Sequence, residues 1–157
     1  MADQHDLQAL VARQHVIETI DELFMATDRK DWAGVRAVLA PKVQFDMSSA
    51  GGGPAAEKTG QEIAAGWEQG LAAIEAVHHQ AGNYRVDVGR DRAEASCYGI
   101  AYHYLPKRSG RNTRVFVGSY DFELENTAGK WRITAFRYNL KFIDGNRELE
   151  KPDEAEG

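Results

Sequence analysis

Cysteine is almost absent from this sequence of 157 residues, which contains only Cys97. One cysteine cannot form an internal disulfide, and its place in a run of alternating residues favours a buried thiol over a nucleophile. A chain of this kind suits a reducing compartment. Paired cysteines are missing and the five histidines are not clustered at ligand spacing, so we expect no metal site and no cofactor.

Long apolar runs and an excess of positive charge are also missing. No apolar stretch approaches the ~18 residues of a membrane helix, and residues 1–6 are polar and acidic, unlike a secretion signal. The 19 lysines and arginines are outnumbered by 24 aspartates and glutamates and are scattered, which argues against nucleic acid as a partner. The glycine run 51–53 lacks the Gly-Lys-Ser/Thr ending of a phosphate loop. We therefore expect a cytoplasmic protein that binds neither membranes nor nucleic acids.

The first half of the sequence has the periodicity of helices. Apolar residues at Leu10, Ile17 and Phe24, flanked by Leu7 and Ile20, predict a long helix over residues 7–28. A short helix capped by Asp31 follows, and a third helix is predicted over residues 61–77. Between them, residues 43–47 alternate as a strand, and the glycine-rich residues 48–60 predict a mobile loop that can cover a pocket mouth.

The second half has the period of strands. Runs over residues 83–89, 92–105, 114–126 and 130–142 are separated by short turn sequences, which predicts an antiparallel meander. Helices followed by such a meander indicate the α+β class, with three helices on the concave face of a strongly curved sheet and a cone-shaped cavity between them. We expect one domain over residues 1–147 and an acidic flexible tail over residues 148–157.

Two adjacent histidines are the first candidates for chemistry. His78 and His79 are expected where the third helix meets the first long strand. Histidine transfers protons near neutral pH, and a buried carboxylate bonded to one ring nitrogen leaves the other nitrogen free to act. Asp21 and Asp28 border the buried stripe of the first helix and can supply that carboxylate. If the third helix continues, its spacing places His78 on the buried face. If the helix ends near residue 77, this reason for choosing His78 disappears.

Alternation within the strands supplies further candidates. Ala101 and His103 share a face made mostly of small residues, which leaves room for a ligand. His103 is either a cavity group that protonates a leaving group or holds a carbonyl, or a wet residue at a strand end. In the last strand, Arg137 and Asn139 share one face, and Arg137 is either a cavity residue or a surface cation.

Several segments resemble the SnoaL-like group of the nuclear-transport-factor-2-like superfamily. They are Ala26–Trp32, Val43–Asp46, His79–Asn83, Gly118–Leu124 and Gly129–Ile133. The resemblance covers about residues 7–142, and the group includes scytalone dehydratase, hexachlorocyclohexane dehydrochlorinase and polyketide cyclases. It implies a cone-shaped α+β barrel and a catalytic pair formed by His79 and Asp28, with His103 as a second polar group. The tyrosines of scytalone dehydratase and the helix lysine of the dehydrochlorinase have no counterpart near Leu23.

These observations and the resemblance predict a cofactor-independent lyase or isomerase, dehydratase-like or dehydrohalogenase-like, that uses the His79–Asp28 pair to remove a proton from a small hydrophobic substrate. A cyclic or aromatic substrate fits the expected lining. That lining comprises Phe24, Phe45, Trp67, Ala101, Phe116, Arg137 and Asn139. A noncatalytic binding or assembly domain and a polyketide-type aldol cyclase are the alternatives. A face carrying Tyr102, Tyr104, Phe136 and Tyr138 predicts a homodimer or a higher homo-oligomer.

Overall fold

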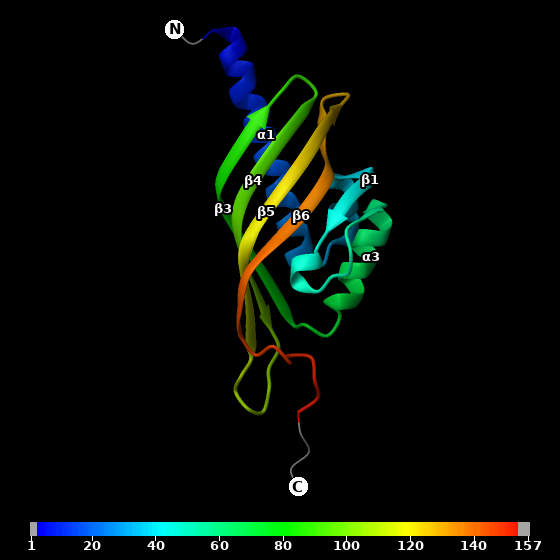
Figure 1. Cartoon of the computed structure of the whole chain (residues 1–157), viewed down its shortest axis with the longest axis vertical. Coiled ribbons are helices and arrows are strands. Elements are labelled where there is room, and N and C mark those ends of the chain that lie inside the picture. Colours follow the sequence, from blue (N-terminus) through cyan, green and yellow to red (C-terminus); the bar gives the residue numbers. More distant parts are fainter. Residues whose placement is uncertain (1–2, 154–157) are drawn as a thin grey trace.

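The computed structural model describes residues 3–153 and consists of three helices and one six-stranded sheet, with the first two strands lying before the third helix in the sequence (Figure 1). The helices are α1 (Gln4–Asp28), α2 (Trp32–Val38) and α3 (Gly60–Gly70), with a short 3-10 helix, η1 (Ser48–Ala50). The strands are β1 (Leu39–Asp46), β2 (Ala56–Lys58), β3 (Ala76–Val88), β4 (Arg92–Tyr104), β5 (Thr113–Thr127) and β6 (Lys130–Gly145).

The six strands form one open sheet in the order β2-β1-β6-β5-β4-β3. Strands β3 to β6 are an antiparallel meander, and β1 joins its far edge in parallel to β6, so the sheet is mixed. The three helices pack on one face, with α1 lying against β3 and β6. The α+β class and the helix-covered curved sheet that the sequence predicts are thus confirmed, although the sheet does not close into a barrel.

The core lies between α1 and the inner face of the sheet. Along β4 the inner face carries Ala93, Ala95, Cys97 and Ala101, all at most 6% exposed. Cys97 is buried as expected, and burial raises the pKa of its thiol to about 12. Helix α1 contributes Ile20, Leu23 and Phe24 to the same core.

Two expectations about helices are wrong. Leu7 and Leu10 are 54% and 61% exposed because the first turns of α1 extend past the sheet, as Figure 1 shows at the N-terminal end. Helix α3 ends at Gly70 instead of residue 77, since the backbone of Glu75 already donates to Tyr104 of β4. His78 and His79 therefore lie within β3 and not at a helix end.

A bulge reverses the expected faces of β6. Ile133 pairs with Leu124 and Ala135 pairs with Glu123, so Thr134 is an extra residue in β6. Beyond it, Phe136 and Tyr138 face the core at 3% exposure each, and Arg137 and Asn139 turn to the outer face. The prediction that Arg137 and Asn139 line the cavity is therefore wrong, as is the placement of Phe136 and Tyr138 on the outer face.

The glycine-rich segment and the C-terminal segment are more ordered than the sequence suggests. Residues 48–60 contain η1 and β2, and the Thr59 side chain caps α3 by accepting a hydrogen bond from the Glu62 backbone at 3.1 Å. Leu149 is 0% exposed, so the expected tail over residues 148–157 is attached to the domain at this position, and its last part, residues 154–157, lies outside the described residues. Within residues 3–153, no helix has the length and hydropathy needed to cross a membrane.

Candidate functional site

Asp28 is the last residue of α1 and faces β3. A carboxylate at a helix C-terminus is unfavourable for the helix dipole, so its position there requires a compensating partner. Lys30 follows in a left-handed conformation (φ 54°), and its ammonium group donates to the carbonyl of Ile74 at 2.6 Å. This contact ties the end of α1 to the segment that leads into β3.

His79 is the compensating partner of Asp28. The imidazole Nδ1 lies 2.6 Å from Asp28 Oδ1, and the backbone N–H of His79 donates to Asp28 Oδ2 at 2.9 Å. The side chains are 15% and 17% exposed, so the pair is largely shielded from water. Phe24, one turn before Asp28, stacks on the imidazole with the ring centroids 5.3 Å apart. The carboxylate and the stacked ring together fix the orientation of the imidazole.

The contact with Asp28 also determines which nitrogen of His79 is free. An ionised carboxylate only accepts hydrogen bonds, so in the neutral imidazole the proton lies on Nδ1 and Nε2 has a free lone pair. Among residues 3–153, Nε2 has no hydrogen-bond partner. An imidazole held in this way can take a proton from a ligand at Nε2 while the carboxylate stabilises the imidazolium that forms.

His78 lies on the opposite side of β3 from His79 and is exposed. Both histidines, with Asp21, Phe24 and Met25, border a hollow of about 350 Å³ at the boundary of α1 and β3. A volume of this size is within the range of small-molecule pockets. Of the two histidines, only His79 contacts a carboxylate within residues 3–153, which favours His79 as the candidate base.

His103 lies close to the pair on the inner face of the sheet. His79 is opposite Ala101 in the β3–β4 ladder, so His79 and His103 are diagonal neighbours, a relation that places Cα atoms about 7–8 Å apart. Phe116 of β5 contacts the His103 ring at a centroid distance of 5.1 Å. The side chains of His79, His103 and Phe116 are only partly buried although they face inward, so solvent reaches this end of the inner face.

The remaining predicted lining residues are divided between two regions. Phe24 and Ala101 lie beside His79. Phe45 of β1 and the partly buried Trp67 of α3 pack on Phe136 of β6, at centroid distances of 5.4 and 5.6 Å. The interior near Phe45 is therefore filled by aromatic rings, and a ligand has access to the inner face nearer to His79.

Sequence analysis missed two inward tyrosines, Tyr120 and Tyr138. Their ring centroids lie 4.8 Å apart, and the Tyr138 hydroxyl is buried without a hydrogen-bond partner in the described part of the chain. Burial raises the pKa of both phenols, that of Tyr138 to about 12, so both remain protonated donors. Alternation along β5 identifies Tyr120, whereas the bulge at Thr134 hides Tyr138.

Asp21 is not part of the histidine pair. Its carboxylate accepts a hydrogen bond from the Tyr84 hydroxyl, and burial together with this bond raises the pKa of the phenol. Tyr84 reaches inward because a bulge follows Gly82, where Asn83 adopts a left-handed conformation (φ 57°). The hydrogen bond between Asp21 and Tyr84 therefore connects α1 to β3 about two helical turns before Asp28.

A second hollow lies on the outer face of the sheet. Its volume is about 1000 Å³, and its lining includes Asp46, Glu94, Asp121, Glu123 and Arg137. The expected cavity residues Arg137 and Asn139 belong to this face, where Arg137 pairs with Asp46 at 3.5 Å and Asn139 donates to Asp121 at 2.8 Å. Across residues 3–153, no group of three or more His, Cys, Asp or Glu side chains is arranged to hold a metal ion.

Residues 8–137 match the model of the SnoaL-like domain. The chain belongs to this family. The matched range begins in α1 and ends in β6, and it contains Asp28, His79 and His103. No curated protein matches the sequence.

Solved structures share the fold of this SnoaL-like domain. The Kfla4162 protein of Kribbella flavida superposes with a TM-score of 0.82 at 25% identity, over 87% of this chain and 95% of that one. A proposed scytalone dehydratase of Novosphingobium aromaticivorans gives 0.77 at 12% identity, over 95% and 97% of the two chains. A hexachlorocyclohexane dehydrochlorinase of Novosphingobium barchaimii gives 0.73 at 14% identity, over 95% and 99%.

Proposed function

We propose that the protein is a cofactor-independent lyase or isomerase in which His79 removes a proton from a carbon atom of the substrate. The observation that carries the proposal is the double hydrogen bond from the ring and the backbone of His79 to Asp28. The pair resembles the base and its orienting carboxylate in other proton-transfer sites. The family and the dehydratase and dehydrochlorinase among the structural relatives support an elimination.

The proposed reaction begins at Nε2 of His79. This nitrogen takes a proton from a carbon next to an activating group, Asp28 stabilises the resulting imidazolium, and the electron pair of the C–H bond moves into the activating group. In an elimination, this pair then forms the new double bond and expels the leaving group. A halide leaves as the anion, whereas a hydroxyl group takes the proton from the His79 imidazolium and leaves as water. In an isomerisation, the imidazolium returns the proton to another carbon. His103 assists by contacting the substrate oxygen or the leaving group.

The proposed substrate is small, hydrophobic and cyclic or aromatic. Phe24 and Phe116 present ring surfaces beside His79 and His103, and Ala101 between the histidines leaves space for a flat molecule. Specificity for apolar rings follows from such surfaces, because they contribute burial of apolar area and stacking.

A panel of cyclic ketones that carry a β-hydroxyl or β-halide tests this proposal. The wild-type protein should release water or halide from at least one compound, detected by mass spectrometry. H79Q should lose about 10²-fold or more of that rate while it keeps its fold by circular dichroism, since Gln can bond Asp28 but cannot take the proton. Binding of the compounds without any turnover would instead identify a noncatalytic binding domain, and equal rates in H79Q would reject the mechanism.

We also propose that two copies associate through the outer face of the sheet. Tyr98, Ile100, Tyr102 and Phe142 are 37–55% exposed there and form an apolar strip across β4 and β6. Sedimentation analysis should give a dimer or larger assembly, and Y98E should shift the protein toward the monomer. A strictly monomeric wild-type protein would contradict the association.

A further inference from the structure

His103 has an arginine as its ring partner. Arg114, opposite His103 in the β4–β5 ladder, has Nη2 3.1 Å from His103 Nδ1. A guanidinium group has donors and no acceptor, so Nδ1 must be the acceptor in this contact. The proton of a neutral His103 therefore lies on Nε2, which has no hydrogen-bond partner within residues 3–153. The free Nε2 of His103 is therefore a hydrogen-bond donor, whereas the free Nε2 of His79 is an acceptor.

Arg114 is itself held by a carboxylate. Its Nη1 donates to Glu150 Oε2 at 2.8 Å, and its Nη2 donates to Oε1 of the same side chain. The Arg114 side chain is 13% exposed, and its guanidinium carbon lies 5.2 Å from the Phe116 ring centroid. A two-point contact between guanidinium and carboxylate fixes the guanidinium plane. The direction in which Arg114 donates to His103 is therefore set by Glu150.

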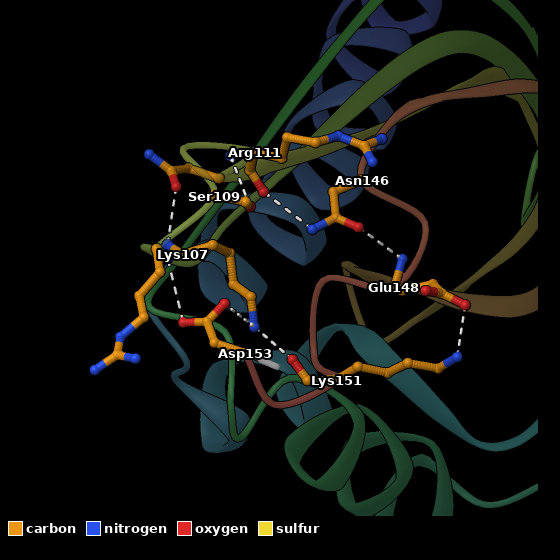
Figure 2. Close-up of polar contacts among 9 residues, drawn as sticks. Lys107, Ser109, Arg111, Asn146, Glu148, Lys151 and Asp153 are labelled. Carbon is orange, nitrogen blue, oxygen red and sulfur yellow. Dashed lines mark hydrogen bonds and ion pairs between the residues drawn. The ribbon is translucent and has the colours of Figure 1, made fainter. Parts of the chain in front are cut away.

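The C-terminal segment, defined here as residues 146–153, places Glu150 next to Arg114. Leu149 is buried against Ile74 and Val77. Figure 2 shows the polar contacts that anchor the segment to the β4–β5 hairpin, including the Asn146 amide donating to the Arg111 carbonyl at 3.0 Å and Lys107 beside Asp153 at 3.4 Å. Because anchors lie on both sides of Glu150, its carboxylate has a defined place at the site.

We propose that Arg114 and Glu150 are positioning residues that hold His103 as the neutral Nε2–H tautomer, so that His103 donates a hydrogen bond to a substrate oxygen. This inference rests on the proposed function and deepens it. His79 accepts a proton at Nε2, and His103, its diagonal neighbour, donates at Nε2. An acceptor at His79 and a donor at His103 together select substrates in which a carbonyl or hydroxyl oxygen lies near the acidic C–H bond.

Some of the charges around His103 lower its pKa and others raise it. Burial lowers its pKa most, and the charges of Arg114 on β5 and His79 on β3 lower it further, to about 4. Glu150 in the C-terminal segment and Asp28 at the end of α1 oppose this effect. His103 is therefore neutral at neutral pH and serves as a hydrogen-bond donor and not as a charged acid.

Long-range ¹H–¹⁵N correlation spectra of the histidine rings test this arrangement in the free, full-length protein. In the wild type at pH 7, His103 should be the Nε2–H tautomer. R114M should give a mixture of tautomers and a higher titration midpoint, and R114K, which keeps a donor, should restore the tautomer. E150Q should not raise the midpoint, because Glu150 favours the charged form. D91N, which removes an exposed carboxylate from the β3–β4 turn at the opposite end of β4, should leave the His103 signals unchanged.

Two results would overturn the inference: an Nδ1–H or charged His103 in the wild-type protein at pH 7, or a His103 tautomer that is the same in R114M. Both are independent of turnover. If H79Q abolishes turnover but His103 is in the other tautomer, this inference fails and the proposed function stands. If His103 behaves as described but H79Q turns over substrate normally, the proposed function fails and the positioning of His103 stands.

Discussion

Replacement of Asp28 by asparagine should reverse the tautomer of His79. The carboxylate accepts two hydrogen bonds from His79, at 2.6 Å from the ring and 2.9 Å from the backbone. An amide has one oxygen and one NH₂ group, so it can satisfy only one of these donors. If its oxygen stays on the fixed backbone N–H, its NH₂ group faces Nδ1. The ring proton then moves to Nε2, and the proposed base has no free lone pair.

The expected loss in kcat for D28N is about 10⁴-fold, as for the corresponding change in a Ser-His-Asp triad, or about 5 kcal/mol of transition-state stabilisation. The loss of charged hydrogen bonds should lower the free energy of unfolding by about 1–3 kcal/mol. Ring ¹H–¹⁵N spectra should show the change of tautomer directly. D21N is the matched control on the same helix, because Asp21 contacts Tyr84 and not His79. An unchanged His79 tautomer in D28N would refute the reasoning.

Two further predictions concern the inner face. In G99A, the added Cβ would lie 2.2 Å from the Tyr120 ring, so thermal denaturation should show a loss of about 1–3 kcal/mol, and an unchanged melting temperature would contradict this packing. His103, with its pKa held at about 4 by burial and by Arg114, should make stability fall as the pH drops from about 6.5 to 4, because the unfolded chain binds the proton first. Between pH 6.5 and 4, the free energy of unfolding of the wild type should fall by at most about 3 kcal/mol more than that of H103N. Identical plots of unfolding free energy against pH for the two proteins would contradict this prediction.

The sequence was most informative where one hydrophobic repeat, helical or alternating, continues through a whole helix or strand. The alternation of β4 correctly assigns Cys97 and Ala101 to the core, and the Asp31 side chain caps α2 as expected, accepting from Gly34 at 2.9 Å. The proximity of His79 to Asp28 was expected from the family resemblance, because helical and strand spacing alone left His78 open. Contacts between residues 51 positions apart depend on how α1 crosses β3, which no local pattern records.

Bulges and terminal segments account for the errors. One extra residue at Thr134 moves every later side chain of β6 to the other face, so the alternation read from Ile133 onward put Arg137 inside. The pairing of Glu75 with Tyr104 replaces the last turns expected for the third helix. In the acidic C-terminal segment, a single apolar residue, Leu149, is sufficient to dock the chain, and composition averaged over the segment conceals it.

Exchange of the acidic substrate proton with solvent deuterium tests the role of His79 most directly. H78Q and H79Q alter neighbouring residues of β3, of which only His79 contacts Asp28. With a substrate found in the ketone panel, the account predicts that H78Q exchanges the proton at the wild-type rate and that H79Q loses about 10²-fold or more. Wild-type exchange by H79Q, or loss of exchange in H78Q alone, would contradict the assignment of the base.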